Sequence, residues 1–310
     1  MNSINPYSKQ RLARSAIFVC RVLLGSLAVI SLSSSSHIDR RDAPTTPIPA
    51  NIATREEFRY GYPGPVVDIN AAEAYVSAYD RRTRNPHWSA EYLTKTNLLP
   101  NDPQTPPSRE DNFSEDPTIP TQFRAGLSPY TRSGYDRGQQ APAGDAKRSQ
   151  SALDETFVLS NIAPQVGQGF GRNYWASFEN FVRDLTKQFD HVYVITGPLY
   201  IPTDAPSSGK ATVTYEVLYG AGLGIAPISV PTHFHKTILV VKGDPASPTS
   251  SALGSFIMPN AAIDNRTPLT NFVADIGKVE VSAGVKFFDK VDRASVQPLC
   301  EATRCEFNKQ

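Results

Sequence analysis

The sequence has few residues that could cross-link it, since its 310 residues include only three cysteines. Three cysteines exclude a disulfide framework as the basis of the fold. It also lacks a dominant charge, because 31 basic and 30 acidic residues give a formal net charge of +1. A strongly basic body is therefore excluded as the reason for any nucleic-acid binding, and binding to a polyanion would need a local patch.

The composition is that of a folded protein. Forty per cent apolar and 20 per cent charged residues exclude wholesale disorder. The length allows one large domain or two small ones. The first 60 residues carry eight of the 31 basic and four of the 30 acidic side chains, which leaves 23 basic and 26 acidic in the other 250. The body of the protein is therefore slightly acidic.

Residues 1–38 have the features of a targeting segment, because they contain four basic residues and no acid up to His37. Within them, Ser15–Leu32 is apolar apart from Arg21 and a few serines. This run is barely long enough to span a bilayer, and Arg21 would be costly at its centre. The segment suits a mitochondrial presequence with an inner-membrane anchor, a secretory signal peptide or a buried soluble helix. Residues 33–63 are rich in serine, proline and threonine, and we assign 39–63 as a linker without a core.

We expect a single folded domain over residues 64–307. The apolar spacing of Asn173–Phe189 predicts an amphipathic helix, and Leu269–Val281 is a weaker helix candidate. Leu99–Pro120 holds six prolines and is expected to lack regular structure. The expected strands are Ala74–Asp80, the end of Ala152–Ser160, His191–Thr196 (stopped by Gly197–Pro198), Thr212–Leu218 and His235–Val241. Strands around one strong helix, without a regular βαβ rhythm, indicate an α+β domain.

Several sequence blocks occur in the order seen in one known family. They include YDRRTRNPHW (79–88), FRAGLSPYTRSGYDRG (123–138), DETFVLSNIAPQVGQGF (154–170) and YWASFENF (174–181). The chain resembles the DNA/RNA non-specific endonucleases over most of residues 58–307, and the mitochondrial endonuclease G type of fungi in particular. The resemblance implies a ββα-metal, or His-Me finger, fold with a mixed, largely antiparallel central sheet flanked by helices.

The resemblance also implies Mg²⁺-dependent hydrolysis of phosphodiesters, with Mn²⁺ as a substitute metal. In the family motif Asp-Arg-Gly-His, the histidine is the general base, and an asparagine on the following helix holds the metal. A glutamate eight residues further along holds the metal's water shell. Mg²⁺ keeps several waters and needs few protein ligands, so this arrangement is chemically sound. A neutral imidazole can take the proton of the attacking water.

This chain departs from the family at both decisive positions. Asp136, Arg137 and Gly138 match the motif, but Gln139 stands at the histidine position, and a carboxamide does not titrate near neutral pH. Counting back eight residues from Glu179 gives Gly171 at the asparagine position, and glycine has no side-chain oxygen for a metal. The sequence therefore predicts impaired or absent cleavage.

Other matching residues keep an expected role. Asn173 would lie on the wrong side of the helix to replace the missing ligand. Arg137 is expected to contact phosphate, and Asn161 either to orient groups at the site or to cap a turn. Glu179 would keep a role in the metal's water shell only if a metal binds. The three arginines of the YDRRTRNPHW block are candidate phosphate contacts, with at least one expected to be paired internally: Arg81, Arg82 and Arg84.

Three functions follow as hypotheses. The chain is a nuclease-family member that binds DNA or RNA but cleaves it poorly; or an active metal-dependent endonuclease with a rearranged site; or a regulatory subunit that dimerises with an active relative. A homodimer or such a heterodimer is expected, with membrane attachment through the N-terminal segment. The resemblance favours the mitochondrial inner membrane, and secretion is the alternative. Cys300 and Cys305 are close enough in sequence to pair, and the residues leave open whether they do.

Overall fold

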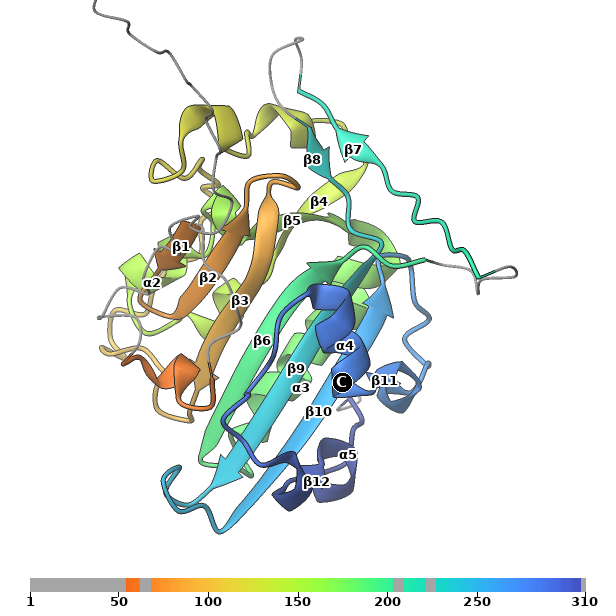
Figure 1. The fold of residues 1–310 in the computed structure, drawn as a ribbon. Coiled ribbons are helices and arrows are strands. Elements are labelled where there is room, and N and C mark those ends of the chain that lie inside the picture. The colour runs from red at the N-terminus through yellow and green to blue at the C-terminus, as the bar shows by residue number, and fades with distance from the viewer. Residues whose placement is uncertain (1–53, 62–67, 203–208, 221–226, 308–310) are drawn as a thin grey trace, which may run out of the picture. The chain divides into compact units, whose positions relative to one another are not determined.

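The computed structural model describes residues 54–61, 68–202, 209–220 and 227–307. Eight strands form one sheet in the order β1–β2–β3–β6–β9–β10–β11, with β12 beside β10 (Figure 1). Every pair is antiparallel except β10 with β12. The expected α+β class with a largely antiparallel sheet is confirmed. The strands are β1 (Asp68–Ala71), β2 (Tyr75–Asp80), β3 (Asn85–Leu93), β6 (His191–Leu199), β9 (His233–Lys242), β10 (Ser250–Pro259), β11 (Val273–Ala274) and β12 (Gln297–Pro298).

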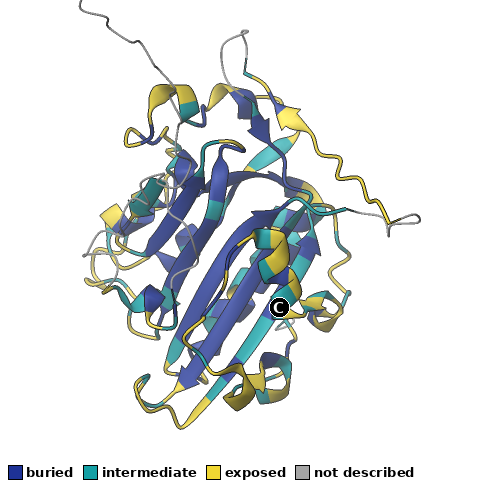
Figure 2. Ribbon diagram, viewed as in Figure 1, coloured by how far each residue is buried: buried dark blue, intermediate teal, exposed yellow. Residues whose placement is uncertain are grey.

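The central strands are buried on both faces (Figure 2). Successive side chains of a strand point to opposite faces of its sheet. Accordingly, Val192 and Val194 of β6 join one apolar cluster, while Tyr193 and Ile195 join another on the opposite face. The sheet therefore separates two cores, each of which needs its own cover.

Helices supply these covers. Helix α3 (Ala176–Leu185) packs Phe178, Phe181, Val182 and Leu185 into the first cluster, and Val279 of α4 (Ile276–Ala283) packs into the second. Figure 1 shows the two helices on opposite faces of the sheet. The predicted amphipathic helix is confirmed over 176–185. The residues ahead of it form the irregular helical segment η6 (Gly167–Trp175), which kinks at Gln168 and Gly169.

The strand expected at the end of Ala152–Ser160 is wrong. This part of the chain holds helix α2 (Gln150–Glu155) and then the 3₁₀ turn η5 (Leu159–Asn161). The helix forms because Ser149 caps it, accepting the backbone N–H of Ala152 at 3.0 Å. The apolar residues that follow are buried without joining a ladder.

Strand β6 runs further than expected, through Gly197–Pro198 to Leu199. Its ladder with β3 ends at Thr196. Pro198, which has no backbone N–H, therefore interrupts no hydrogen bond between β6 and β3. A Cβ at Gly197 would lie 2.6 Å from the His87 carbonyl oxygen, which explains the glycine.

The remaining predictions hold in part. Leu99–Pro120 contains no helix or ladder strand, as expected. Within Thr212–Leu218, only Val217–Leu218 is a strand, β7, which pairs with β8 (Ile228–Ser229). Leu269–Val281 is divided between the 3₁₀ turn η7 (Leu269–Phe272), β11 and α4. The 3₁₀ turn and short strand β11 explain why its helical pattern was weak.

The described part of the domain begins earlier than residue 64. The 3₁₀ turn η1 (Glu56–Phe58) places Phe58 edge-on against Trp88, with ring centres 5.8 Å apart, and Tyr60 lies against Tyr193 at 4.8 Å. The assignment of 39–63 as a linker without a core is thus corrected for residues 54–61. The predicted targeting segment, 1–38, lies outside the described residues. Among the residues that are described, no helix has the length and apolarity needed to cross a membrane.

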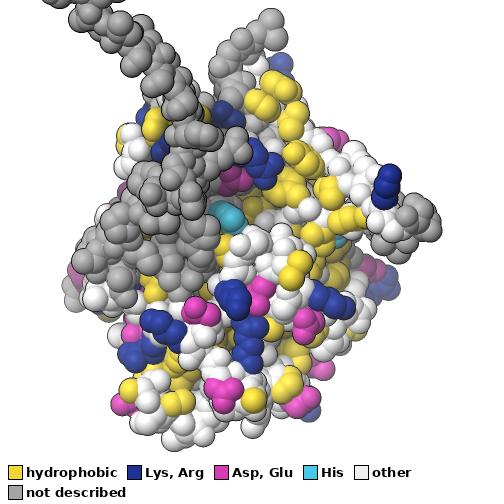
Figure 3. Space-filling model, in the orientation of Figure 1, with side chains coloured by type: hydrophobic (Ala, Val, Ile, Leu, Met, Phe, Trp, Pro, Cys, Tyr) yellow, Lys and Arg dark blue, Asp and Glu magenta, His cyan; other side chains and the backbone are white. Residues whose placement is uncertain are grey.

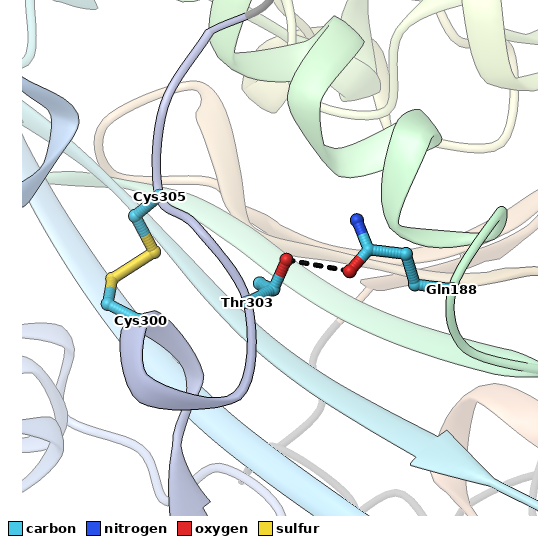
Figure 4. Close-up of a disulfide and its surroundings, with 4 residues drawn as sticks. All are labelled: Gln188, Cys300, Thr303 and Cys305. Carbon is cyan, nitrogen blue, oxygen red and sulfur yellow. Dashed lines mark hydrogen bonds between the residues drawn. A yellow bond between two sulfur atoms is a disulfide. The ribbon is translucent and has the colours of Figure 1, made fainter.

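The chain's last described segment is anchored to the sheet and to α3. Cys300, in α5 (Leu299–Ala302), is disulfide-bonded to Cys305 (Figure 4). The Thr303 hydroxyl donates to Gln188 Oε1 at 2.9 Å, just beyond the end of α3. The pairing that the sequence left open is therefore present.

An extended arm over residues 209–219 leads to β7. Its alternate side chains Val213, Tyr215, Val217 and Tyr219 are exposed. Figure 3 shows hydrophobic side chains gathered along the β7–β8 side of the molecule, whereas acidic and basic side chains are interspersed elsewhere on this face. The extended arm and β7 together therefore carry a run of exposed apolar side chains at alternate positions.

Candidate active site

A cleft of about 690 Å³ lies where β4 (Tyr135–Gln139), η6 and α3 meet. The DRGQ motif forms one wall, and Gly171, Trp175 and Glu179, at successive four-residue steps, form another. Residues of the proline-rich segment border the opening. The structure thus brings together four of the residues singled out from the sequence, namely Arg137, Gln139, Gly171 and Glu179.

The motif strand is positioned by its pairing with β5 (Ile162–Val166). In this antiparallel pair, Asp136 lies opposite Gln165 and Gly138 opposite Ala163. A Cβ on Gly138 would lie 2.7 Å from the Cβ of Gln165, so the motif glycine is what allows Gln165 to pack there. Arg137 and Gln139 alternate to the other face of the strand.

The carboxamide of Gln139 is fully engaged in structural hydrogen bonds. Its Nε2 donates to the Thr156 carbonyl oxygen at 3.1 Å and to Thr156 Oγ1 at 2.8 Å. Its Oε1 accepts the backbone N–H of Ala143 at 3.3 Å. The side chain therefore fastens the end of β4 to the turn after α2, and it holds no titratable group at the position of the predicted general base.

Asn161 organises the backbone behind this position. It is fully buried, and its Oδ1 accepts from Ser89 Oγ at 3.1 Å and from the Ala141 N–H at 2.9 Å. Its Nδ2 donates to the carbonyl oxygens of Ala141 and Thr156 at 2.9 and 3.0 Å. These bonds tie the turn at Thr156 to the backbone of Ala141, and Asn161 and Gln139 share Thr156 as a partner.

The helical segment η6 offers the cleft no ligand at Gly171. A Cβ added there would lie 2.6 Å from Gln165 Oε1 and 3.2 Å from the Val166 carbonyl oxygen. Asn173 accepts the Gly169 N–H at 2.8 Å and borders a different depression. It is therefore directed to the kink rather than to the cleft, as the helical spacing predicted.

The residues present do not fit the metal that the family resemblance implies. Asp136, a carboxylate of the cleft, is held in a two-bond ion pair by Arg172, with both N–O distances at 2.6 Å. Residue 171 is a glycine and has no side-chain oxygen, so Glu179 has no oxygen ligand from that position beside it. In the described part of the chain, no group of three or more His, Cys, Asp or Glu side chains could hold a metal ion.

Glu179 belongs to a group of charges between α3 and the sheet. Burial raises the pKa of Glu179 to about 7, against the opposing effect of Lys236 and Arg183. Arg183 pairs with the buried Asp145, and Lys236 donates to a threonine hydroxyl at 2.6 Å. Burial also raises the pKa of Glu91, and Asp145 raises it further. Three acids against two bases favour a protonated carboxyl in this group.

We expect Glu179→Gln to stabilise the protein at pH 8 and to have little effect at pH 5. The folded-state pKa of Glu179 is raised from 4.5 to about 7. Between these two pKa values the folded protein keeps a proton that the unfolded chain releases, so the free energy of unfolding falls as pH rises. The glutamine of the variant does not ionise, and the variant therefore does not lose this stability at high pH. Urea denaturation should show a stabilisation by Glu179→Gln that is about 2 kcal/mol larger at pH 8 than at pH 5. The exposed Glu301→Gln is the control, and an equal effect of Glu179→Gln at both pH values would contradict the interpretation.

The motif arginine is free to bind an anion. The Arg137 guanidinium lies 4.2 Å from the centre of the Phe113 ring, is exposed, and has no ion pair with any described residue. By contrast, Arg109 pairs with Asp111 at 3.1 Å, and Arg172 is held by the motif aspartate. Arg109 and Arg172 are therefore held in ion pairs at the cleft, whereas Arg137 is in no ion pair with a described residue.

The three arginines of the 79–88 block lie away from this cleft. Arg81 forms an ion pair with Asp68. Arg84 is buried, with a φ of 56°, and donates to a backbone carbonyl oxygen at 2.9 Å. Arg82 remains exposed, 3.8 Å from Asp80. The expected internal pairing thus applies to Arg81, and the burial of Arg84 leaves it unsuited to contact nucleic acid.

A site residue that the sequence analysis did not single out is Gln165. It is 4 % exposed, lines the cleft, and lies between the two glycines, Gly138 and Gly171. The one sequence feature that could have indicated this role is its position four residues after Asn161. That spacing alone does not show that the intervening strand directs Gln165 under η6.

The fold and cleft are those of a ββα-type nuclease: an antiparallel ribbon bearing Asp-Arg-Gly, followed by a helix that lines the same cleft. The family model for DNA/RNA non-specific endonuclease matches residues 54–294, and the chain belongs to that family. Nuclease C1 of Cunninghamella echinulata var. echinulata is 49% identical, over 80% of this chain and 93% of that protein.

Two further relatives place the chain within the family. The mitochondrial nuclease of Saccharomyces cerevisiae is 44% identical, over 80% of this chain and 74% of its own length. A solved structure of the EndoG/EndoGI complex contains a chain that is 41% identical, with a TM-score of 0.70, covering 80% of this chain and 95% of that one. The resemblance to mitochondrial endonuclease G-type enzymes is therefore confirmed.

Proposed function

We propose that this chain binds nucleic acid in the cleft but hydrolyses it poorly or not at all. The observation that carries the proposal is the pair of residues that replace the working groups of the family. Gln139 is a carboxamide committed to three hydrogen bonds, and Gly171 is a glycine whose neighbouring space is occupied by Gln165.

Each replacement removes a distinct part of the chemistry. A positioned general base contributes about 10²–10⁴-fold to a rate. A bound divalent metal supplies charge stabilisation of the phosphate and of the leaving oxygen. With Gln139 and Gly171, the cleft can still orient a phosphodiester, but no group at residue 139 takes the proton of an attacking water.

Arg137 supports retained binding. It is exposed, unpaired among the described residues and held over Phe113 at the cleft edge. A guanidinium presents several donors that match phosphate oxygens. The half-buried aromatic residues Phe113 and Tyr135 border the same cleft and offer surfaces for bases.

We therefore expect the purified chain to bind a short labelled oligonucleotide, with Arg137→Ala weakening binding about tenfold because one charge-assisted contact is lost. Fluorescence anisotropy at fixed salt measures this, and electrophoresis of the same sample checks that the oligonucleotide stays intact. Arg304→Ala, at an exposed arginine that does not line the cleft, is the control. Equal affinities for wild type and Arg137→Ala would remove Arg137 from the site.

An active enzyme with a rearranged site is the second candidate. Glu179 favours it, as a carboxylate of the cleft that is not in an ion pair with Arg172. In that case Glu179→Ala would abolish cleavage by the wild-type chain.

A regulatory subunit is the third candidate, and the exposed apolar arm favours it. Val213, Tyr215, Val217 and Tyr219 present one apolar face suited to a protein partner, either a second copy or an active relative. Co-purification with an active nuclease, unchanged when Arg137 is substituted, would distinguish this function from nucleic-acid binding.

A mitochondrial location is proposed from the relatives and from the N-terminal composition. The yeast relative is named a mitochondrial nuclease. Residues 1–38 are basic and acid-free, as in a presequence. Attachment to the inner membrane would rest on Ser15–Leu32, outside the described residues, and secretion is the alternative that the same segment allows.

A further inference from the structure

The cleft wall contains a buried amide with an unused donor. Gln165 is 4 % exposed, and its Nε2 has no hydrogen-bond partner among the described residues. A buried N–H without a partner costs about 1–3 kcal/mol, so such groups are uncommon unless a ligand or water completes them. Gln165 lines the cleft, but its Nε2 is enclosed, so a molecule bound there reaches the N–H only when the carboxamide rotates.

Gly171 lets the carboxamide of Gln165 lie against the backbone of η6. A Cβ at residue 171 would lie 2.6 Å from Gln165 Oε1, so any larger residue at 171 would displace the carboxamide. The terminal torsion of a glutamine is broad and nearly two-fold, so rotation exchanges the oxygen and the nitrogen at little cost. An anion beside Gly171 would select the orientation that turns the N–H toward it.

The surrounding charges favour an anion over a cation. Two of the acids in the cleft, Asp111 and Asp136, are already neutralised by ion pairs. Arg172, the neighbour of Gly171 in the chain, uses Nε and Nη2 for Asp136, which leaves its Nη1 for another acceptor. Three of the four arginines that line the cleft are in ion pairs, Arg109 with Asp111, Arg172 with Asp136 and Arg183 with Asp145, so among the described residues Arg137 and the Nη1 of Arg172 are the donors left for an anion.

From these observations we propose that the space at Gly171 is an anion subsite, in which Gln165 and Arg172 hold a phosphate oxygen of the bound nucleic acid without a divalent cation. This inference rests on the proposed nucleic-acid binding, and it adds which groups contact the phosphate. Where the family resemblance implies a metal between protein and phosphate, this chain would contact the phosphate directly with N–H groups.

The test is oligonucleotide binding by the full chain in EDTA, measured by fluorescence anisotropy. We expect binding to persist in EDTA and to weaken about tenfold in Gln165→Glu, which replaces the donor by a negative charge of the same shape. Gly171→Ala, which takes the space of Gln165 Oε1 and so displaces the amide without changing its charge, should weaken binding similarly. Gln297→Glu, on exposed β12, makes the same charge change away from the cleft and should have no effect.

The outcomes separate this inference from the proposed function. Binding that requires Mg²⁺, or binding in EDTA that is unchanged in both Gln165→Glu and Gly171→Ala, would overturn the subsite while leaving nucleic-acid binding in place. If Gln165→Glu fails to fold, Gly171→Ala alone decides. No binding by the wild-type chain with or without Mg²⁺ would overturn the proposed function itself.

Discussion

The double substitution Gln139→His with Gly171→Asn is expected to produce a Mg²⁺-dependent nuclease from this chain. It returns a titratable base to β4 and a side-chain oxygen to η6, on the two walls of the same cleft. We expect cleavage of plasmid DNA about 10²–10⁴-fold faster than by the wild-type chain. Each single substitution should produce little nuclease activity, because a general base without a metal, or a metal without a general base, supplies only one of the two groups that the reaction needs.

The structure indicates what must move in this variant. The asparagine introduced in place of Gly171 needs the space now taken by Gln165 Oε1, which is the flexible end of a side chain and can turn away. The histidine introduced in place of Gln139 gives up the hydrogen bonds that the glutamine makes with Thr156 and Ala143. The matched control is Gln139→Asn with Gly171→Asn, which alters the same positions without adding a base. A folded, inactive double variant would show that the cleft has changed elsewhere as well.

Asn161→Leu is expected to cause the largest loss of stability. The change removes four buried hydrogen bonds and leaves Ser89 Oγ and both the N–H and the carbonyl oxygen of Ala141 without these partners, while the Thr156 carbonyl oxygen keeps its bond from Gln139. At about 1–3 kcal/mol for each buried partner, the loss should be at least about 4 kcal/mol, or on the order of 10 °C in Tm.

Urea and thermal denaturation measure this loss. The exposed Asn265→Leu is the control, and it should change stability little. Because Thr156 also holds Gln139, the variant should lose oligonucleotide binding before it unfolds globally. A loss below about 1 kcal/mol would mean that water or side-chain rearrangement replaces the bonds of Asn161.

Local patterns predicted the elements whose burial follows from their own side chains. The stripe of Phe178, Phe181, Val182 and Leu185 predicted α3, and the continuous apolar run after His191 predicted β6. Where a neighbour decides the outcome, the pattern was insufficient. The ladder with β9, which continues to Leu199, and not the residues Gly197–Pro198 themselves, determines how far β6 extends.

The site was predictable as far as its positions depend on motif and spacing. Gln139, Gly171 and Glu179 line one cleft, as the order of motif and helix implied. The surroundings of each residue were not predictable. Arg84 carries a positive charge like its neighbours in the 79–88 block, yet it is buried where the backbone turns at a positive φ. Gln165 becomes a site residue only through the packing of β5 under η6.

The central claim is that Gln139 and Gly171 disable phosphodiester cleavage. The most direct measurement is nicking of supercoiled plasmid by the wild-type chain in molar excess, with Mg²⁺ or Mn²⁺, beside the double substitution and Glu179→Ala. The account predicts intact plasmid with the wild type and nicked plasmid with the double substitution. Rapid nicking by the wild type that disappears in Glu179→Ala would contradict it and establish a rearranged active site.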